Sequence, residues 1–70
     1  MRYKSPLKRI RQSAQLSLRE LSSISGVSKT TIYDIEKDPK SNPTVGTICD
    51  LAAALGVDPH TIYPRLNYGS

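Results

Sequence analysis

The sequence predicts an all-α domain built from five short helices. Helix-capping residues recur along the chain, apolar residues follow them at spacings of three and four, and no segment shows the alternation of a β-strand. The length of 70 residues suits one small domain. A domain of this size buries only roughly 60% of its extended-chain surface, which leaves no room for a large catalytic cleft.

Capping residues set the predicted helix boundaries. The expected helices span residues of about 6–14, 18–25, 29–37, 45–55 and 59–63. Their N-caps are Ser5, Ser17, Ser28, Thr44 and Asp58. "SLRE", which begins at Ser17, is also a capping box, in which a serine and a glutamate each bond the other's backbone N–H. Gly26 and Gly56 are expected to end the second and fourth helices, because glycine adopts the left-handed conformation without strain.

One side of each helix is apolar and defines the expected core. The expected inner residues are Leu7, Ile10, Ala14, Leu18, Leu21, Ser22, Ser25, Val27, Ile32, Ile35, Val45, Ile48, Leu51, Ala52 and Leu55. Cys49 lies beside this face and is expected to be a small buried hydrophobe. His60 is expected to face solvent.

Composition and charge narrow the function. The net charge is +4, and residues 1–40 hold nine of the ten Lys and Arg. This distribution fits a polyanionic partner such as nucleic acid and a plain soluble basic domain about equally well, because charge informs on association and not on fold. The single cysteine excludes an internal disulfide and a cysteine zinc cage. No apolar run approaches the roughly 18 residues of a membrane span, and the N-terminus has no signal-peptide core. We therefore expect a cytoplasmic protein without a membrane partner. The chain shows no catalytic constellation, metal-ligand spacing or cofactor loop, so we predict no enzyme, no metal and no cofactor.

The second and third predicted helices are joined only by "GVS", residues 26–28. So short a connection forces a sharp angle, which is the geometry of a helix-turn-helix. Ser22 is small and lies where the two backbones would meet, while Val27 and Ile32 would fill the crossing from the third helix. The outer side of that helix then carries a stripe formed by Lys29, Thr30, Tyr33, Asp34 and Lys37.

With these landmarks in order, residues 7–63 resemble the lambda-repressor-like, or XRE-type, helix-turn-helix family. The matching segments are "LKRIR", "LSLRELS", "GVSKTTIYDIE", "NPTVGTICDLAAALGV" and "DPHTIY". The resemblance implies that the third helix enters the DNA major groove and contacts bases through Lys29, Thr30, Tyr33 and Asp34. The phosphate contacts it implies are Ser17, Leu18, Ser28, Thr31, Lys37, Lys40 and Asn42, and its structural residues are Arg11, Glu36, Ser22 and Gly26, with Arg11 and Glu36 as a salt bridge.

The sequence departs from the family pattern at two positions. Leu18 stands where the family often has a glutamine that bonds DNA, so a phosphate contact there has to come from backbone N–H groups. Ser22 replaces the usual alanine, and its hydroxyl can bond the carbonyl one turn back.

The stripe carries groups that can distinguish bases. Lysine donates to guanine O6 and N7, threonine contacts several bases, and a carboxylate such as that of Asp34 accepts from cytosine N4. Plainer interpretations stay open: Lys29 and Lys37 as solvated charges, Asp34 as a cap or as the partner of a nearby lysine, and Tyr33 as packing at the helix edge.

We therefore predict a sequence-specific, double-stranded DNA-binding transcriptional regulator, a repressor at a palindromic operator, of prokaryotic or phage type and associated with the nucleoid. The expected organisation is an arm at 1–5, a DNA-binding domain at 6–64 and a tail at 65–70. A homodimer, which can assemble on the DNA itself, is the predicted working form. Its expected surface contains Ile62, Tyr63, Leu66 and Tyr68, unless the last two fold back on their own domain. The alternatives are a protein-interaction module of antitoxin or antirepressor type, and the DNA-binding part of a longer regulator.

Overall fold

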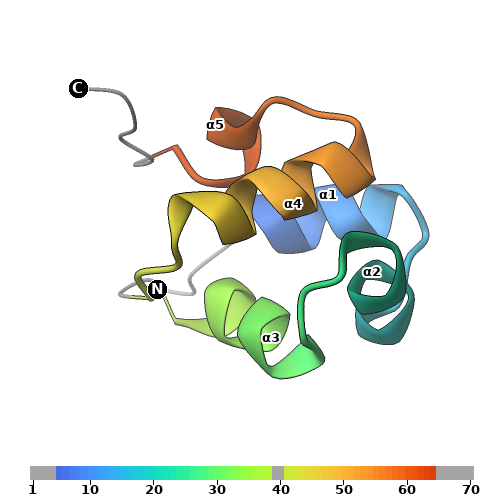
Figure 1. The fold of residues 1–70 in the computed structure, drawn as a ribbon. Helices are drawn as coiled ribbons and strands as arrows, with labels where there is room; N and C mark the ends of the chain where they lie inside the picture. Colours follow the sequence, from blue (N-terminus) through green and yellow to red (C-terminus); the bar gives the residue numbers. More distant parts are fainter. Residues whose placement is uncertain (1–4, 39–40, 65–70) are drawn as a thin grey trace.

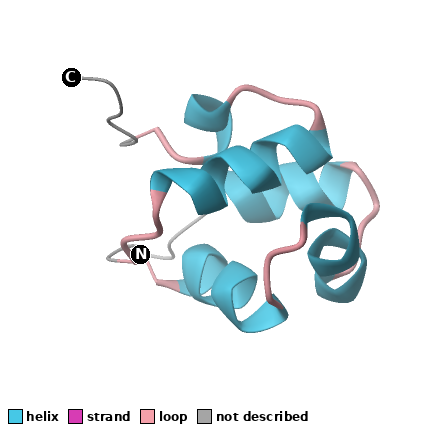
Figure 2. Ribbon diagram, in the orientation of Figure 1, coloured by secondary structure: helices cyan, strands magenta, loops and turns pink. Residues whose placement is uncertain are grey.

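The computed structural model describes residues 5–38 and 41–64, and every regular element within them is a helix (Figures 1 and 2). The elements are α1 (Pro6–Ser13), α2 (Leu18–Ser25), α3 (Lys29–Lys37), α4 (Val45–Leu55) and α5 (Pro59–Ile62). The predicted all-α class with five short helices is confirmed. The first helix ends one residue earlier than predicted, at Ser13, and the fifth ends at Ile62 with Tyr63 as its cap.

Each helix begins at the capping residue that the sequence predicts. The five caps accept a hydrogen bond from a backbone N–H two or three residues further on: Lys8 to Ser5, Glu20 to Ser17, Thr31 to Ser28, Thr47 to Thr44 and His60 to Asp58. At the last of these, the backbone hydrogen bond from His60 lowers the pKa of the Asp58 carboxyl. These bonds satisfy N–H groups that have no partner inside their own helix.

The core draws on all five helices. Its fully buried large side chains are Leu7, Leu21, Ile32, Ile48, Leu51 and Ile62. Helix α4 packs against α2 and α5, α1 packs against α3 and α5, and α2 packs against α3. Helix α3 is therefore held by two neighbours on its inner side, and Figure 1 shows it at one edge of the molecule.

Several burial predictions need correction. Val45 fits the apolar spacing of α4 but is 39% exposed at the first position of that helix. Ala14 is exposed beyond the end of α1, and Cys49 is only half-buried. His60 is exposed, as predicted.

The predicted dimer surface is wrong for Ile62, one of its four residues. Ile62 is only 2% exposed, because α1 and α4 both pack against α5 and enclose it. Tyr63 is half-buried, and its hydroxyl donates a 3.0 Å hydrogen bond to the Ser41 carbonyl. Leu66 and Tyr68 lie outside the described residues.

The turn after α1 places a non-glycine residue in the left-handed region. Gln15 has a φ of 59°, and it is the described non-glycine residue with a positive φ. Its N–H bonds the Gln12 carbonyl at 2.9 Å, and the next N–H, of Leu16, bonds the Arg11 carbonyl at 3.1 Å. This pair of bonds is the Schellman arrangement, in which glycine is the usual left-handed residue.

Gln15→Gly is therefore expected to raise the free energy of unfolding by about 0.5–1 kcal/mol. The left-handed conformation costs an L-residue roughly 1–2 kcal/mol, and the added freedom of glycine in the unfolded chain offsets part of that gain. Thermal or urea unfolding measures the change. The matched control is Gln12→Gly in α1, which is expected to destabilise by about 1 kcal/mol. Loss of stability in both variants would contradict the prediction.

Candidate nucleic-acid interface

The connection between α2 and α3 sets the angle of the two helices. Gly26 has a φ of 77°, and its N–H bonds the Ser22 carbonyl at 2.9 Å. A Cβ built on Gly26 meets nothing within 4 Å, so conformation and not space requires glycine here. Ser25 Oγ accepts from the Val27 N–H at 3.1 Å, and the Val27 side chain is buried below the turn. Ser22, predicted at the crossing, is half-buried.

Helix α3 separates its residues into an inner and an outer side. Ile32, Ile35 and Glu36 are buried on the inner side. The exposed outer side carries Lys29, Thr30, Tyr33, Asp34 and Lys37, which we call the α3 stripe. The structure thus brings the four predicted base-contacting residues to one exposed face.

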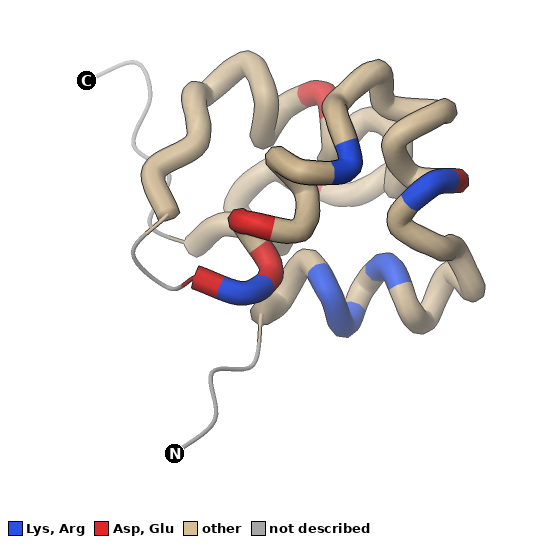
Figure 3. Tube along the Cα trace, turned by 90° about the horizontal axis from the view of Figure 1, so that it is seen from below, with Lys and Arg blue, Asp and Glu red and all other residues tan. Residues whose placement is uncertain are grey.

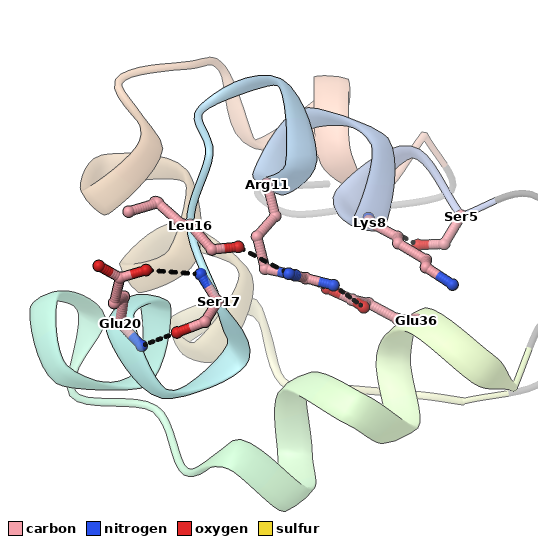
Figure 4. A network of polar contacts seen from close by, with 7 residues as sticks. All are labelled: Ser5, Lys8, Arg11, Leu16, Ser17, Glu20 and Glu36. Atoms are coloured by element: carbon pink, nitrogen blue, oxygen red, sulfur yellow. Dashed lines mark hydrogen bonds and ion pairs between the residues drawn. The ribbon is translucent and has the colours of Figure 1, made fainter.

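Arg11 and Glu36 connect the inner side of α3 to α1 (Figure 4). Arg11 Nε donates to Glu36 Oε2 at 2.7 Å, and Arg11 Nη2 donates to Glu36 Oε1 at 3.0 Å. The two side chains are only 10% and 4% exposed. The hydrogen bond to Glu36 raises the pKa of the Arg11 guanidinium, against the opposing effect of burial. This two-point contact fixes how far α3 is rotated relative to α1.

Arg11 also makes a contact that sequence reasoning missed. Its Nη1 donates to the Leu16 carbonyl at 2.7 Å, which ties the turn before α2 to the same guanidinium (Figure 4). A backbone carbonyl has no sequence signature, so no pattern could have indicated this bond. Arg11 therefore holds α1, the start of α2 and α3 in one arrangement.

The start of α2 is predicted to contact phosphate. There the backbone N–H groups of Ser17 and Glu20 are already hydrogen-bonded within a capping box (Figure 4). Ser17 Oγ accepts from the Glu20 N–H at 3.0 Å, and Glu20 Oε1 accepts from the Ser17 N–H at 2.8 Å. The Leu18 side chain is half-buried and packs on the core. The arrangement leaves the Ser17 hydroxyl proton available to an acceptor, but it also places the Glu20 carboxylate beside the expected phosphate.

The other predicted phosphate contacts surround α3. Ser28 is exposed, and its hydroxyl donates to Thr31 Oγ1 at 2.8 Å, which orients both hydroxyls at the start of the helix. Asn42 is exposed in the loop before α4, which Tyr63 holds through the Ser41 carbonyl. Sequence reasoning had assigned Tyr63 to dimerisation and missed this support. Lys40 lies outside the described residues.

The described residues, taken together, carry no net charge. All six Asp and Glu of the chain are described, and they are balanced by six described Lys and Arg. Figure 3 shows both signs on the side that carries α3. The excess of +4 therefore belongs to the four cations outside the described residues, Arg2, Lys4, Lys40 and Arg65.

Two other kinds of site are absent from the described part of the chain. No described helix is both long and apolar enough to cross a bilayer. No three His, Cys, Asp or Glu side chains among the described residues are grouped so that they could hold a metal ion.

The sharp turn between α2 and α3, together with the exposed polar side of α3, defines a helix-turn-helix protein. The chain belongs to the XRE-type helix-turn-helix family, whose sequence profile matches residues 7–62. The chain is also similar to the solved structure of a SinR protein/SinI protein complex, at 29% sequence identity and a TM-score of 0.73. The match covers 89% of this chain and 64% of that one. No match was found among curated protein sequences.

These comparisons confirm the predicted lambda-repressor-like fold. The family is one of DNA-binding transcription regulators and not of enzymes. The chain spans 64% of the length of the SinR-type chain that it matches.

Proposed function

We propose that this protein is a sequence-specific regulator of transcription that binds double-stranded DNA with α3 in the major groove and represses by occupying an operator. The observation that carries the proposal is the α3 stripe, whose polar side chains are exposed while Ile32, Ile35 and Glu36 are buried on the opposite side of the same helix. An α-helix fits the major groove, where each base pair presents a distinct pattern of donors and acceptors.

Base contacts are assigned to Lys29, Thr30, Tyr33 and Asp34. Lys29 stands in the first turn of α3, the part of a recognition helix that typically contacts base edges. Thr30, Tyr33 and Asp34 follow on the same exposed side. The rigid attachment of α3 through the Arg11–Glu36 pair supports this assignment, because base recognition needs a fixed orientation of the helix.

Phosphate contacts position the protein on the duplex. We assign them to Ser17, Ser28, Thr31, Lys37, Lys40 and Asn42 and to the backbone N–H of Leu18. Because the described residues sum to no net charge, we assign much of the general attraction to DNA to Arg2, Lys4, Lys40 and Arg65. Each phosphate contact contributes a slope of roughly −0.9 to the dependence of log affinity on log salt.

Selection of binding sites from random double-stranded DNA tests the proposal directly. A DNA-binding regulator enriches one motif, and its affinity for that motif falls steeply with salt. Enrichment of no motif, or a nearly flat salt dependence, would refute it.

Single variants then distinguish residues that recognise bases from residues that attract DNA of any sequence. Lys29→Ala and Thr30→Ala are each expected to relax the preference at one base pair by about 1–3 kcal/mol, because each removes one base contact. Lys40→Ala is expected to weaken all sequences alike and to reduce the salt slope by about 1. Binding measured on the selected motif and on scrambled DNA, at several salt concentrations, distinguishes the two classes. A base-specific effect of Lys40→Ala would contradict the division.

A second candidate function is a protein-interaction module. Two observations favour it: the described residues together have no net charge, and Ile24 on α2 is 56% exposed. The similar solved structure is itself a complex of a SinR protein with a SinI protein. The protein-interaction function becomes the better supported of the two if selection from random DNA enriches no motif.

A further inference from the structure

We propose that Tyr33 and Lys37 act as a pair that keeps the Asp34 carboxylate free of ion pairs, so that Asp34 selects a cytosine through its unmodified N4 amino group. This inference rests on the proposed DNA-binding function. It adds a positioning role for two stripe residues and a chemical requirement on the operator.

The geometry of the α3 stripe carries the first step. Asp34 precedes Lys37 by three residues, a spacing at which opposite charges on a helix commonly pair. The Lys37 ammonium instead lies over the Tyr33 ring, 5.7 Å from its centroid. A cation is attracted to the face of an aromatic ring at this distance. The aromatic ring thus competes with the carboxylate for the same lysine.

The contacts and exposure of Asp34 agree with that competition. Its carboxylate forms no ion pair with any residue that the structure describes, and the described ion pairs join other residues. Its side chain is exposed on the side of α3 opposite Ile32 and Ile35. Asp34 therefore enters an interface with DNA as an uncompensated negative charge that can only accept hydrogen bonds.

Such a group selects strongly among base edges. In the major groove, guanine and thymine present only acceptors, adenine presents a donor next to the N7 acceptor, and cytosine presents the N4 amino donor. An unpaired carboxylate is repelled by acceptors and satisfied by cytosine, so it rejects the wrong bases as well as binding the right one. A lysine bound to the carboxylate would cancel both effects.

The contact depends on one particular hydrogen of the cytosine. One N4 hydrogen is used in the base pair with guanine, and the other points into the major groove. A methyl group in place of the second hydrogen removes the donor and leaves the base pair. The selected operator should therefore lose affinity when N4-methylcytosine replaces the cytosine at the Asp34 position.

The first experiment compares sites selected by the wild-type protein and by Asp34→Asn. Asparagine is nearly isosteric and pairs with adenine N6 and N7. We expect one position of the motif to change from cytosine to adenine, with a preference of about fivefold or more in each case. N4-methylcytosine at that position should weaken wild-type binding by a similar factor and leave Asp34→Asn binding unchanged.

The second experiment tests the positioning role, with the cytosine preference at that one position as its readout. Tyr33→Ala releases Lys37 and is expected to reduce the preference although Asp34 is intact. Tyr33→Phe keeps the ring and is expected to keep the preference. The double variant Tyr33→Ala/Lys37→Gln removes the competing lysine and is expected to restore it. These side chains are exposed, and a melting curve of each variant verifies that the fold is retained.

The outcomes separate this inference from the proposed function. A motif that stays unchanged in Asp34→Asn, with tighter binding to all DNA, would show that Asp34 is only a repulsive charge and would overturn the inference while DNA binding stands. Failure of the double variant to restore the preference would overturn the role of Tyr33 and Lys37. If the wild-type protein enriches no motif, the proposed function itself is refuted.

Discussion

Glu36→Ala is expected to lower the free energy of unfolding by about 3–5 kcal/mol, because it leaves a buried guanidinium without its partner. Arg11 is held by two bonds to Glu36, of 2.7 and 3.0 Å, in a pair whose side chains are at most 10% exposed. Small domains have a total stability of roughly 0.05–0.15 kcal/mol per residue, so the loss would be a large share of the whole. Thermal unfolding should show a fall of about 10 °C or more.

The matched control is Asp50→Ala, which removes an exposed carboxylate from the interior of α4. It is expected to change stability by about 0.5 kcal/mol or less. The double variant Arg11→Met/Glu36→Leu replaces both charges by apolar groups and should recover much of the loss, because no charge is then stranded. A melting temperature of Glu36→Ala equal to that of the wild type would show that the pair contributes nothing.

The parts of the fold that sequence predicted well are those with local causes. The capping box of Ser17 and Glu20 is contained in four consecutive residues, and the left-handed end of α2 depends on Gly26 alone. Neither needs information from elsewhere in the chain. Sequence spacing also placed the α3 stripe opposite Ile32 and Ile35, because one helical period decides which residues share a side.

The parts that sequence missed depend on distant neighbours. The exposure of Val45 and the burial of Ile62 depend on which other helices pack over each position, and helical spacing within one segment does not encode this. The bond from Tyr63 to the Ser41 carbonyl spans 22 residues and ends on backbone. Gln15 adopts the conformation usually left to glycine, and its side chain gives no sign of this.

The candidate site also has a part that the sequence predicted and a part that it missed. Which residues are exposed on α3 followed from its period, whereas the position of the Lys37 ammonium over Tyr33 did not. Lys37 has two possible partners within one turn, and their competition depends on side-chain conformation. The sequence therefore left the pairing of Asp34 open.

Two molecules are expected to bind one operator made of two symmetric half-sites, with centres roughly 34–36 Å apart, one turn of DNA. A single module of this size buries only roughly 600–1,000 Å² of protein surface on DNA. Helix α3 spans nine residues, and its four proposed base-contacting side chains reach only a few base pairs. Two half-sites multiply their discrimination, so replacing one by random sequence should lower the affinity toward the non-specific level, by about 10³-fold or more.

Stoichiometry on the selected operator measures this directly, for example by sedimentation of the complex. The control is an operator with both half-sites intact but separated by an extra half turn, on which cooperative binding should be lost. Truncation after Pro64 removes Leu66 and Tyr68 but keeps Ile62 and Tyr63, which belong to the fold. If the tail joins the two molecules, the truncated protein binds each half-site independently and keeps its melting temperature. One molecule on an asymmetric site would contradict the homodimer, because a two-fold protein pair requires a two-fold site.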